Sequence, residues 1–180
     1  MNLTVEPVKG KNRRKVKEIY TASFLKEDRM PFWLMRALAK TKNTDFLTFY
    51  DGDILCGFVY MAAVKDLVFN MFFAVDETHR SKGYGGKILE KVQSIYPDRK
   101  LIISIERCDE PAENMEQRLR RKRFYLRNGY VETKYLLEMG HEAQEILIKN
   151  GTFQAEEFFS FFLKYSNGTV RPKIWRKEDI

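Results

Sequence analysis

The segment His79–Lys87, with the sequence HRSKGYGGK, is the feature that most constrains how this chain folds. It follows the apolar run Leu67–Val75 and precedes a stretch whose apolar residues recur at helical spacing, so it predicts a strand, a glycine-rich turn and a helix N-terminus. Its glycines and basic residues are Gly83, Gly85, Gly86, Arg80, Lys82 and Lys87. Glycines let a ligand approach the backbone, and the N–H groups of a first helical turn carry partial positive charge. The pattern indicates a phosphate-binding turn, although the glycines alone would indicate only a tight connection.

Two blocks of the sequence resemble the GNAT superfamily of acyl-CoA-dependent N-acyltransferases. Arg80-x-x-Gly83-x-Gly85 matches the family signature R/Q-x-x-G-x-G/A, and FYLRNGY at 124–130 resembles the family segment F/L-Y-x-x-x-G-F/Y. The run FAVD at 73–76 is similar to the strand end that precedes the signature. The resemblance extends over residues 13–140 and is strongest over 67–130. Competing signatures fit less well, because Gly86-Lys87 lacks the Ser or Thr of a Walker A loop and the third glycine of a dinucleotide fingerprint is missing.

Hydrophobic periodicity predicts alternating elements along one domain, residues 1–180. Strands are expected over 3–8, 46–50, 54–64, 67–75, 100–106, 130–139 and 153–165, and helices over 13–25, 31–40, 84–95 and 114–127. Asp51-Gly52-Asp53 predicts a hairpin turn, and residues 154–159 also allow a helical turn. The expected fold class is α/β: a mixed, mostly antiparallel central sheet of about seven strands with about four flanking helices. The resemblance implies a splay between strands 4 and 5.

The net charge of +7 has two explanations, a nucleic-acid partner or an anionic cofactor. The densest basic run, Arg118–Arg123, lies in a helical pattern, but its charges do not form one stripe. Arg120, Arg123 and Arg127 share one face, and Met115, Leu119 and Leu126 form an apolar face. No aromatic-interleaved strand pattern accompanies the run. Nucleic acid is therefore not the expected partner.

The remaining composition predicts a reduced, soluble protein. Cys56 and Cys108 lie in or just after apolar runs, so we expect free thiols. His79 and His141 are not spaced with other ligands, so no metal site is indicated. Since the sequence has no apolar run of eighteen residues and no signal-peptide pattern, a cytoplasmic location and no membrane partner are expected.

The resemblance implies acetyl-CoA as cosubstrate. The resemblance implies that backbone N–H groups at 82–86 hold the pyrophosphate, with help from Arg80. It also implies that the strand end 73–75 runs along the pantetheine arm. A bulge beside that strand end would expose an N–H to the thioester oxygen. The candidate cofactor residues are Phe73, Ala74, Val75, Arg80, Ser81, Lys82, Gly83, Tyr84, Gly85, Gly86, Lys87, Asn114, Arg118 and Arg121. The family asparagine usually stands seven residues before the helix tyrosine, where this chain has Arg118, so Asn114 is alternatively a helix N-cap.

Two residues are candidates for proton transfer. The resemblance places Tyr125 opposite the CoA sulfur as general acid; the alternative is a packing aromatic on an amphipathic helix. Glu106 ends the predicted strand 100–106 and would accept the proton of the amine, directly or through water. Its alternative is a salt-bridged carboxylate at a strand terminus.

The expected activity is acetyl transfer to a primary amine of a small molecule or peptide by direct attack. The alternative is a non-catalytic acyl-CoA sensor or interaction module. Aminoglycosides, polyamines, protein N-termini and lysines all remain open as acceptors. Glu27, Asp28, Asp109 and Glu110 would suit a cationic amine if they gather at the acceptor pocket. The aromatic run 158–162 offers a surface for a homodimer.

Overall fold

The computed structural model describes residues 2–41 and 43–177. Its described residues form two compact units, the first comprising the chain up to Ala63 together with Asn70–Pro97, and the second Val64–Phe69 together with the chain from Asp98 on. The expectation of a single domain over 1–180 stays a prediction.

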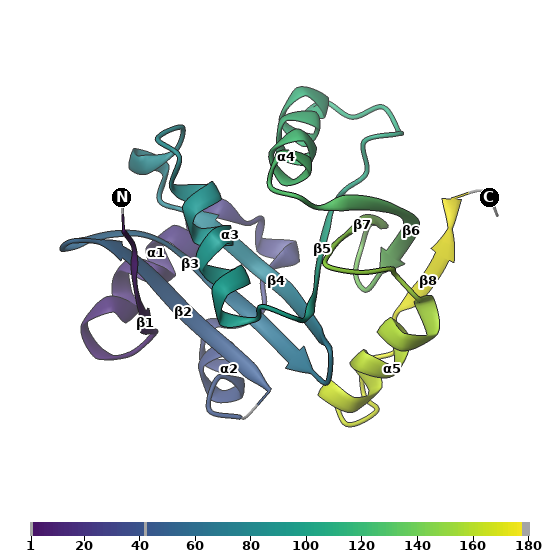
Figure 1. Ribbon diagram of the computed structural model, residues 1–180, viewed down its shortest axis with the longest axis horizontal. Helices are drawn as coiled ribbons and strands as arrows, with labels where there is room; N and C mark the ends of the chain where they lie inside the picture. The colour runs from purple at the N-terminus through teal and green to yellow at the C-terminus, as the bar shows by residue number, and fades with distance from the viewer. Residues whose placement is uncertain (1, 42, 178–180) are drawn as a thin grey trace. The chain divides into compact units, whose positions relative to one another are not determined.

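The first unit contains β1 and β2, all of β3 except Val64, part of β4 and three α-helices. Its elements are β1 (Thr4–Pro7), α1 (Arg13–Ser23), α2 (Phe32–Leu38), β2 (Thr44–Asp51), β3 (Ile54–Val64), the later part of β4 (Leu67–Val75) and α3 (Tyr84–Ile95). Strands β1, β2 and β3 pair antiparallel in that order, and β4 follows β3. Figure 1 shows α3 on one face of these strands and α1 and α2 on the other.

The second unit continues from the first residues of β4. Its elements are β5 (Lys100–Glu106), α4 (Met115–Arg127), β6 (Val131–Glu138), β7 (Gln144–Lys149), α5 (Ala155–Tyr165) and β8 (Lys173–Arg176). The strand order is β4-β5-β7-β6-β8, and the pairs from β5 onward are antiparallel. The boundary between the units divides β4 after Phe69. The predicted class of mixed, mostly antiparallel α/β sheet is confirmed, with eight strands and five α-helices in the described chain.

Aromatic packing around Tyr20 builds the core of the first unit. Val16, Ile19 and Tyr20 of α1 are buried, as their helical spacing predicts. The Tyr20 ring lies 5.5 Å from Phe24, 6.1 Å from Phe32 and 5.1 Å from Phe72, measured between ring centroids. These contacts fix the positions at which the chain leaves α1 and enters α2. The segment between the two helices is therefore anchored at both ends on one buried tyrosine.

On the opposite face of the first unit, Gly57 of β3 lets the end of β4 and helix α3 come close to β3. A Cβ atom there would lie 2.4 Å from the carbonyl oxygen of Ala74 and 3.0 Å from Cδ1 of Ile88. Only glycine accommodates that spacing without a shift of backbone. The absence of a side chain lets α3 pack directly over the end of β4, which positions the loop between them.

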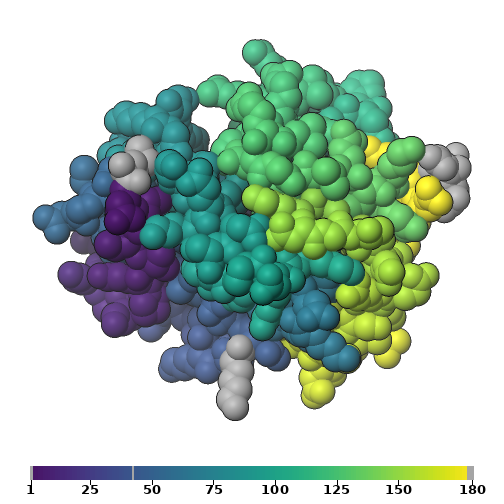
Figure 2. All heavy atoms as spheres, in the orientation of Figure 1, coloured from purple at the N-terminus to yellow at the C-terminus, as the bar shows by residue number. Residues whose placement is uncertain are grey.

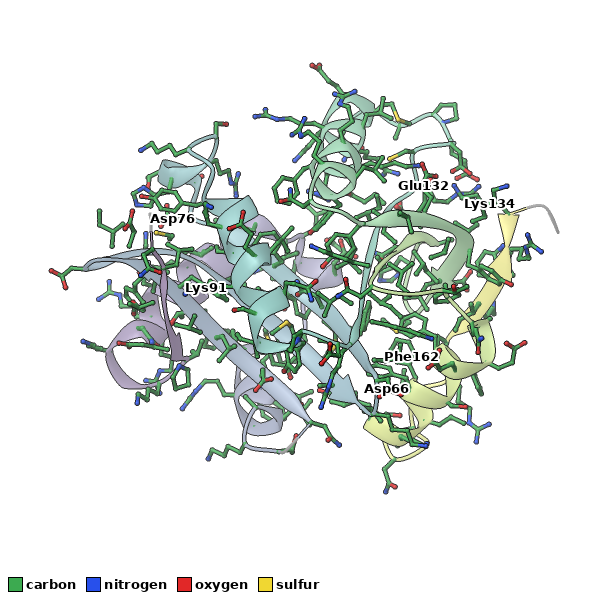
Figure 3. All side chains as sticks on the ribbon, in the orientation of Figure 1. Asp66, Asp76, Lys91, Glu132, Lys134 and Phe162 are labelled. Carbon is green, nitrogen blue, oxygen red and sulfur yellow. The ribbon has the colours of Figure 1, made fainter. Side chains whose placement is uncertain are left out.

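Helix α5 corrects the predicted strand over 153–165. Its phenylalanines at 158, 161 and 162 follow the i, i+3, i+4 period of a helix, which outweighs the β propensity of the aromatic run. All three are buried, and the Phe69 ring lies 5.3 Å from Phe158 and 5.5 Å from Phe162. Phe162 is labelled on α5 in Figure 3. Because these side chains fill the core of the second unit, the run does not offer the dimer surface that the sequence suggested.

Other expectations need smaller corrections. Ile95 at the end of α3 is 39% exposed and Trp33 of α2 is 70% exposed, although both residues are apolar. The strands β7 and β8 were not predicted at all. The hairpin turn at Asp51–Asp53, the helix over 84–95 and the strand over 100–106 are confirmed. Within the described chain, no helix is both long enough and apolar enough to cross a membrane.

Candidate functional site

The loop between β4 and α3 leaves the amide groups of the helix N-terminus uncapped. Gly83 is the N-cap residue, with φ of 86° in the left-handed region and no side-chain capping hydrogen bond. The N–H of Lys87 donates to the carbonyl of Gly83 at 3.3 Å, so the N–H groups of Tyr84, Gly85 and Gly86 precede the first helical hydrogen bond. Backbone donors in this arrangement suit a phosphate group. The loop therefore fits the pyrophosphate of a CoA molecule.

Asp76 anchors the start of this loop. It is 2% exposed, its carboxylate lies 2.6 Å from the Lys15 ammonium, and it accepts hydrogen bonds from the N–H and the hydroxyl of Thr78 at 3.0 and 2.7 Å. Burial alone would raise the pKa of Asp76, but the Lys15 and Thr78 interactions outweigh it and lower the pKa to about 2. Figure 3 labels Asp76 at the end of β4. This buried carboxylate ties α1 to the residues that lead into the loop.

The charge on Asp76 should stabilise the fold in a defined pH window. Because its pKa in the folded protein, about 2, lies below the ordinary value of 3.8, its contribution is complete above pH 4 and is lost as the pH falls towards 2. Asp76→Asn should remove about 2 kcal/mol of unfolding free energy at neutral pH and flatten the acid limb of the stability curve. Urea unfolding between pH 2 and 7 measures this. Glu18→Gln, which removes a carboxylate from an exposed ion pair, is the control. An equal fall of the unfolding free energy at acid pH in wild type and in Asp76→Asn would contradict the assignment.

The basic side chains of the loop bind protein groups. Arg80 donates through Nε to the carbonyl of Val75 and through Nη2 to the hydroxyl of Ser23, both at 3.3 Å. Lys82 donates to the carbonyl of Thr78 at 3.0 Å, and the Lys87 ammonium lies 2.9 Å from Glu90. All three side chains are nevertheless exposed. These side chains are therefore engaged with protein groups, whereas no side chain caps the N–H groups at the start of α3.

Tyr84 has a structural role that the sequence did not suggest. Its hydroxyl donates to the Asp51 carboxylate at 2.9 Å, and this hydrogen bond raises the pKa of Tyr84. The ring packs edge-on against His79 with centroids 5.8 Å apart. Tyr84 therefore holds the loop against the β2–β3 turn, while its backbone N–H remains part of the helix terminus.

The strand end that leads to the loop packs on the core of the first unit. Met71 and Phe72 both pack against the core cluster around Tyr20. Ala74 is buried, while Phe73 and Val75 are half-buried. These last three residues are the ones that the resemblance associates with the pantetheine arm.

In the second unit, β5 and α4 bring several predicted residues together. Glu106 at the end of β5 forms an ion pair with Arg121 of α4. Arg118 donates to the Asn114 side chain at 2.8 Å and to the carbonyl of Arg107 at 3.1 Å. Asn114 stands at the N-cap position of α4, but its side chain makes no capping bond. These charged groups are therefore already paired within the unit.

Tyr125 is the buried residue of α4. It is 8% exposed, and its ring lies 5.1 Å from Phe124 and 5.5 Å from Tyr130. Burial raises the pKa of Tyr125 to about 12, against the opposing charge of Arg121. The hydroxyl therefore keeps its proton at neutral pH. A buried phenol in this state is a proton donor rather than a base.

The buried face of α4 differs from the expected apolar face. Leu126 is 38% exposed, whereas Lys122 is mostly buried and lies 2.8 Å from the Glu145 carboxylate on β7. Arg120, Arg123 and Arg127 are exposed, as expected, and Figure 2 shows α4 at the surface, in green at the top of the view. Ion pairs to Glu106 of β5 and to Glu145 of β7 thus help to attach this helix to the sheet.

Glu145 is the centre of an ion network that the sequence did not reveal. Its carboxylate lies 2.8 Å from both Lys122 and Lys177 and accepts the N–H of Cys108 at 3.0 Å. Burial would raise the pKa of Glu145, but these partners lower it. Asp109, which lies near Arg107 and Lys177, has a pKa lowered to about 2. Arg107 also lies 2.6 Å from Glu110. Both Asp109 and Glu110 are therefore already paired with basic side chains, and neither is an unpaired carboxylate that could bind a cationic amine.

Buried polar atoms without a hydrogen-bond partner among the residues that the structure describes include the side-chain amide of Asn70 on β4 and Nε of Arg29 between α1 and α2. Neither was singled out from the sequence. Cys56 and Cys108 are free thiols, as expected. Across residues 2–41 and 43–177, no group of three His, Cys, Asp or Glu side chains is arranged to hold a metal ion.

Comparisons with known proteins place this geometry in context. A family model described as an acetyltransferase (GNAT) domain matches residues 42–132. No curated protein matches the sequence significantly. Among solved structures, a protein assigned to the GNAT acetyltransferases from Bacteroides thetaiotaomicron has a TM-score of 0.71 at 21% identity, over 87% of this chain and 92% of its own.

Two further solved structures have the same fold. The ribosomal-protein-S18-alanine N-acetyltransferase from Escherichia coli has a TM-score of 0.62 at 14% identity, over 86% of this chain and 97% of its own. The PaiA N-acetyltransferase from Thermoplasma acidophilum, solved in complex with coenzyme A, has a TM-score of 0.57 at 13% identity, over 83% of this chain and 99% of its own. At these identities the likeness concerns the fold.

Proposed function

Because this chain belongs to the GNAT family of acetyltransferases, we propose that it transfers an acetyl group from acetyl-CoA to a primary amine. The observation that carries the proposal is the uncapped N-terminus of α3 behind Gly83. Its N–H groups suit the pyrophosphate of the cosubstrate. PaiA from Thermoplasma acidophilum, which shares the fold, binds coenzyme A, and this supports the same cosubstrate here.

We assign binding of acetyl-CoA chiefly to the backbone. The N–H groups of 82–86 would hold the pyrophosphate, and Arg80, Lys82 and Lys87 would add long-range attraction from their exposed positions. The strand end 73–75 would hydrogen-bond the pantetheine arm. Arg118 and Arg121 already bind partners in their own unit, so we rank them below the other candidate cofactor residues.

The proposed reaction is direct attack. The amine nitrogen forms a bond to the thioester carbonyl carbon, the carbon–sulfur bond breaks, the thiolate takes up a proton and the attacking nitrogen loses one. Tyr125 is proposed to protonate the thiolate, supported by a pKa of about 12 that keeps the phenol protonated. Glu106 is the proposed base, acting directly or through water, but its ion pair with Arg121 favours the alternative of a structural carboxylate. In that case the proton of the amine passes to water.

Release of free thiol from acetyl-CoA tests this function. The protein is mixed with acetyl-CoA and a panel of amino acids, peptides, polyamines and aminoglycosides, and binding of acetyl-CoA is measured in parallel by calorimetry. Amine-dependent thiol release supports the enzyme. Binding without release by any amine favours the non-catalytic sensor, and absence of binding contradicts both.

A further inference from the structure

The net positive charge of the chain is concentrated in one short stretch, the basic segment Lys9–Lys17. Its nine residues include six basic side chains and no acidic one. The basic residues are Lys9, Lys11, Arg13, Arg14, Lys15 and Lys17, and all six are exposed. Since the whole chain has 32 basic and 25 acidic residues, the remainder has 26 basic and 25 acidic residues, a net charge of +1. The charge of +7 is therefore largely a property of one surface.

The basic segment is held in place on the first unit by buried groups. The side-chain nitrogen of Asn12, a residue that is 4% exposed, donates to the carbonyl of Pro7 at 3.1 Å and to the hydroxyl of Thr48 at 3.3 Å. The side-chain oxygen of Asn12 accepts the N–H of Lys9 at 2.8 Å. Val16 of α1 is completely buried in the core of the unit. The basic side chains thus project from a positioned backbone, which lowers the entropic cost of binding a partner.

Most of this charge has no partner within the protein. Lys15 pairs with Asp76 and Arg14 pairs with Glu18. The other four form no ion pair with any residue that the structure describes, namely Lys9, Lys11, Arg13 and Lys17. Like charges four residues apart on a helix repel each other, and positive charges at a helix N-terminus oppose its dipole. The first turn of α1 has no acidic residue to offset them. Interactions within the chain therefore do not account for these side chains.

The basic run of α4 differs in this respect. Three of its residues pair with carboxylates of the second unit, namely Arg118, Arg121 and Lys122. The expectation of no nucleic-acid partner was drawn from this run, which is partly neutralised by the protein itself. The structure therefore directs attention to Lys9–Lys17 as the surface on which an anionic partner would bind.

We propose that the basic segment binds nucleic acid through its phosphate backbone, without recognition of the base sequence. Clustered positive side chains displace the counterions of phosphates, and the resulting affinity does not depend on the bases. The one apolar side chain of the segment, Val16, is buried. The segment therefore lacks both the exposed anchor typical of protein interfaces and the apolar face of a helix that inserts into a membrane. Its complementarity is to charge alone, and this surface is separate from the proposed acetyl transfer.

Fluorescence anisotropy with labelled duplexes of RNA and of DNA, each in two unrelated sequences, tests the proposal between about 50 and 200 mM salt. Wild type should bind both sequences of a duplex equally and lose affinity steeply as salt rises. The triple variant Lys11→Gln, Arg13→Gln, Lys17→Gln should reduce the slope of log affinity against log salt on DNA by about two to three, because each lost phosphate contact removes about 0.9.

A matched variant separates this segment from the general charge of the protein. Arg120→Gln, Arg123→Gln, Arg127→Gln removes the same charge from exposed positions of α4 and should change the slope by less than about one. Equal losses in the two triple variants would overturn the proposal, as would absence of duplex binding by wild type at the lowest salt. The melting temperature of the Lys11, Arg13, Lys17 variant should be unchanged or higher, because mutually repelling charges are removed.

Two further measurements distinguish other anionic partners. A fall of acetyl-CoA affinity in the Lys11, Arg13, Lys17 variant would assign the segment to the cosubstrate and overturn the proposal. Tighter binding of wild type to vesicles containing phosphatidylserine than to either duplex, lost in the same variant, would assign the segment to a membrane surface and also overturn it. Absence of amine-dependent thiol release, in contrast, contradicts only the proposed acetyl transfer, because duplex binding is measured without turnover.

Discussion

Replacing Gly85 by valine should abolish binding of acetyl-CoA. Gly85 is the second residue of α3, and its N–H precedes the first helical hydrogen bond. A branched side chain there would stand between the amides and the pyrophosphate, and the affinity should fall by at least about a hundredfold, equivalent to losing two or more charge-assisted hydrogen bonds. Isothermal titration calorimetry measures the change.

The fold itself should tolerate this substitution. Valine has a higher helix propensity than glycine, so α3 should form and the melting temperature without ligand should change little. Gly140→Val is the matched control, because a Cβ at that exposed glycine meets nothing within 4 Å. Wild type should gain thermal stability from acetyl-CoA, less so at high salt, while Gly85→Val gains none. Undiminished affinity in Gly85→Val would remove the loop from the cosubstrate site.

The loop was predictable from sequence because its determinants are local. A strand, a glycine in a left-handed conformation at 83 and an amphipathic helix follow one another within thirty residues, and each has its own sequence signal. The α3 bounds agree residue for residue with the predicted 84–95. The helix α5 lacked such a signal, since four phenylalanines within five residues satisfy both a strand and a helix, and only the core around Phe69 decides between them.

The charged groups could not be assigned from sequence, because their partners are distant along the chain. Arg121 pairs with Glu106 fifteen residues earlier, and Lys122 pairs with Glu145 twenty-three residues later. Helical periodicity placed Leu126 on the apolar face of α4, but Leu126 is 38% exposed, while Lys122 is mostly buried in the ion network. Nε of Arg29 shows the converse, since its lack of a hydrogen-bond partner among the described residues is visible only once the surrounding atoms are placed.

Removing the Tyr125 hydroxyl should slow turnover without weakening acetyl-CoA binding. Tyr125→Phe keeps the ring that packs against Phe124 and Tyr130, so the melting temperature should stay close to that of wild type. If the phenol protonates the departing thiolate, kcat should fall by about ten- to a thousandfold, the usual size of general-acid catalysis. Calorimetry of acetyl-CoA binding and steady-state kinetics with a saturating acceptor separate the two quantities.

Glu106→Gln provides the comparison that makes the result specific. If Glu106 is the base, its loss should lower kcat and remove the fall of the rate on the acid side of the pH profile, because the group that must be deprotonated is gone. If the carboxylate only pairs with Arg121, the variant should keep the profile and lose stability instead, since Arg121 is left without its partner. Tyr125→Phe, in contrast, should lower kcat across the whole pH range below about 10, because a phenol with a pKa of about 12 is fully protonated throughout it. A full-rate Tyr125→Phe enzyme would reduce this tyrosine to a packing residue of α4 and leave the thiolate to be protonated by water.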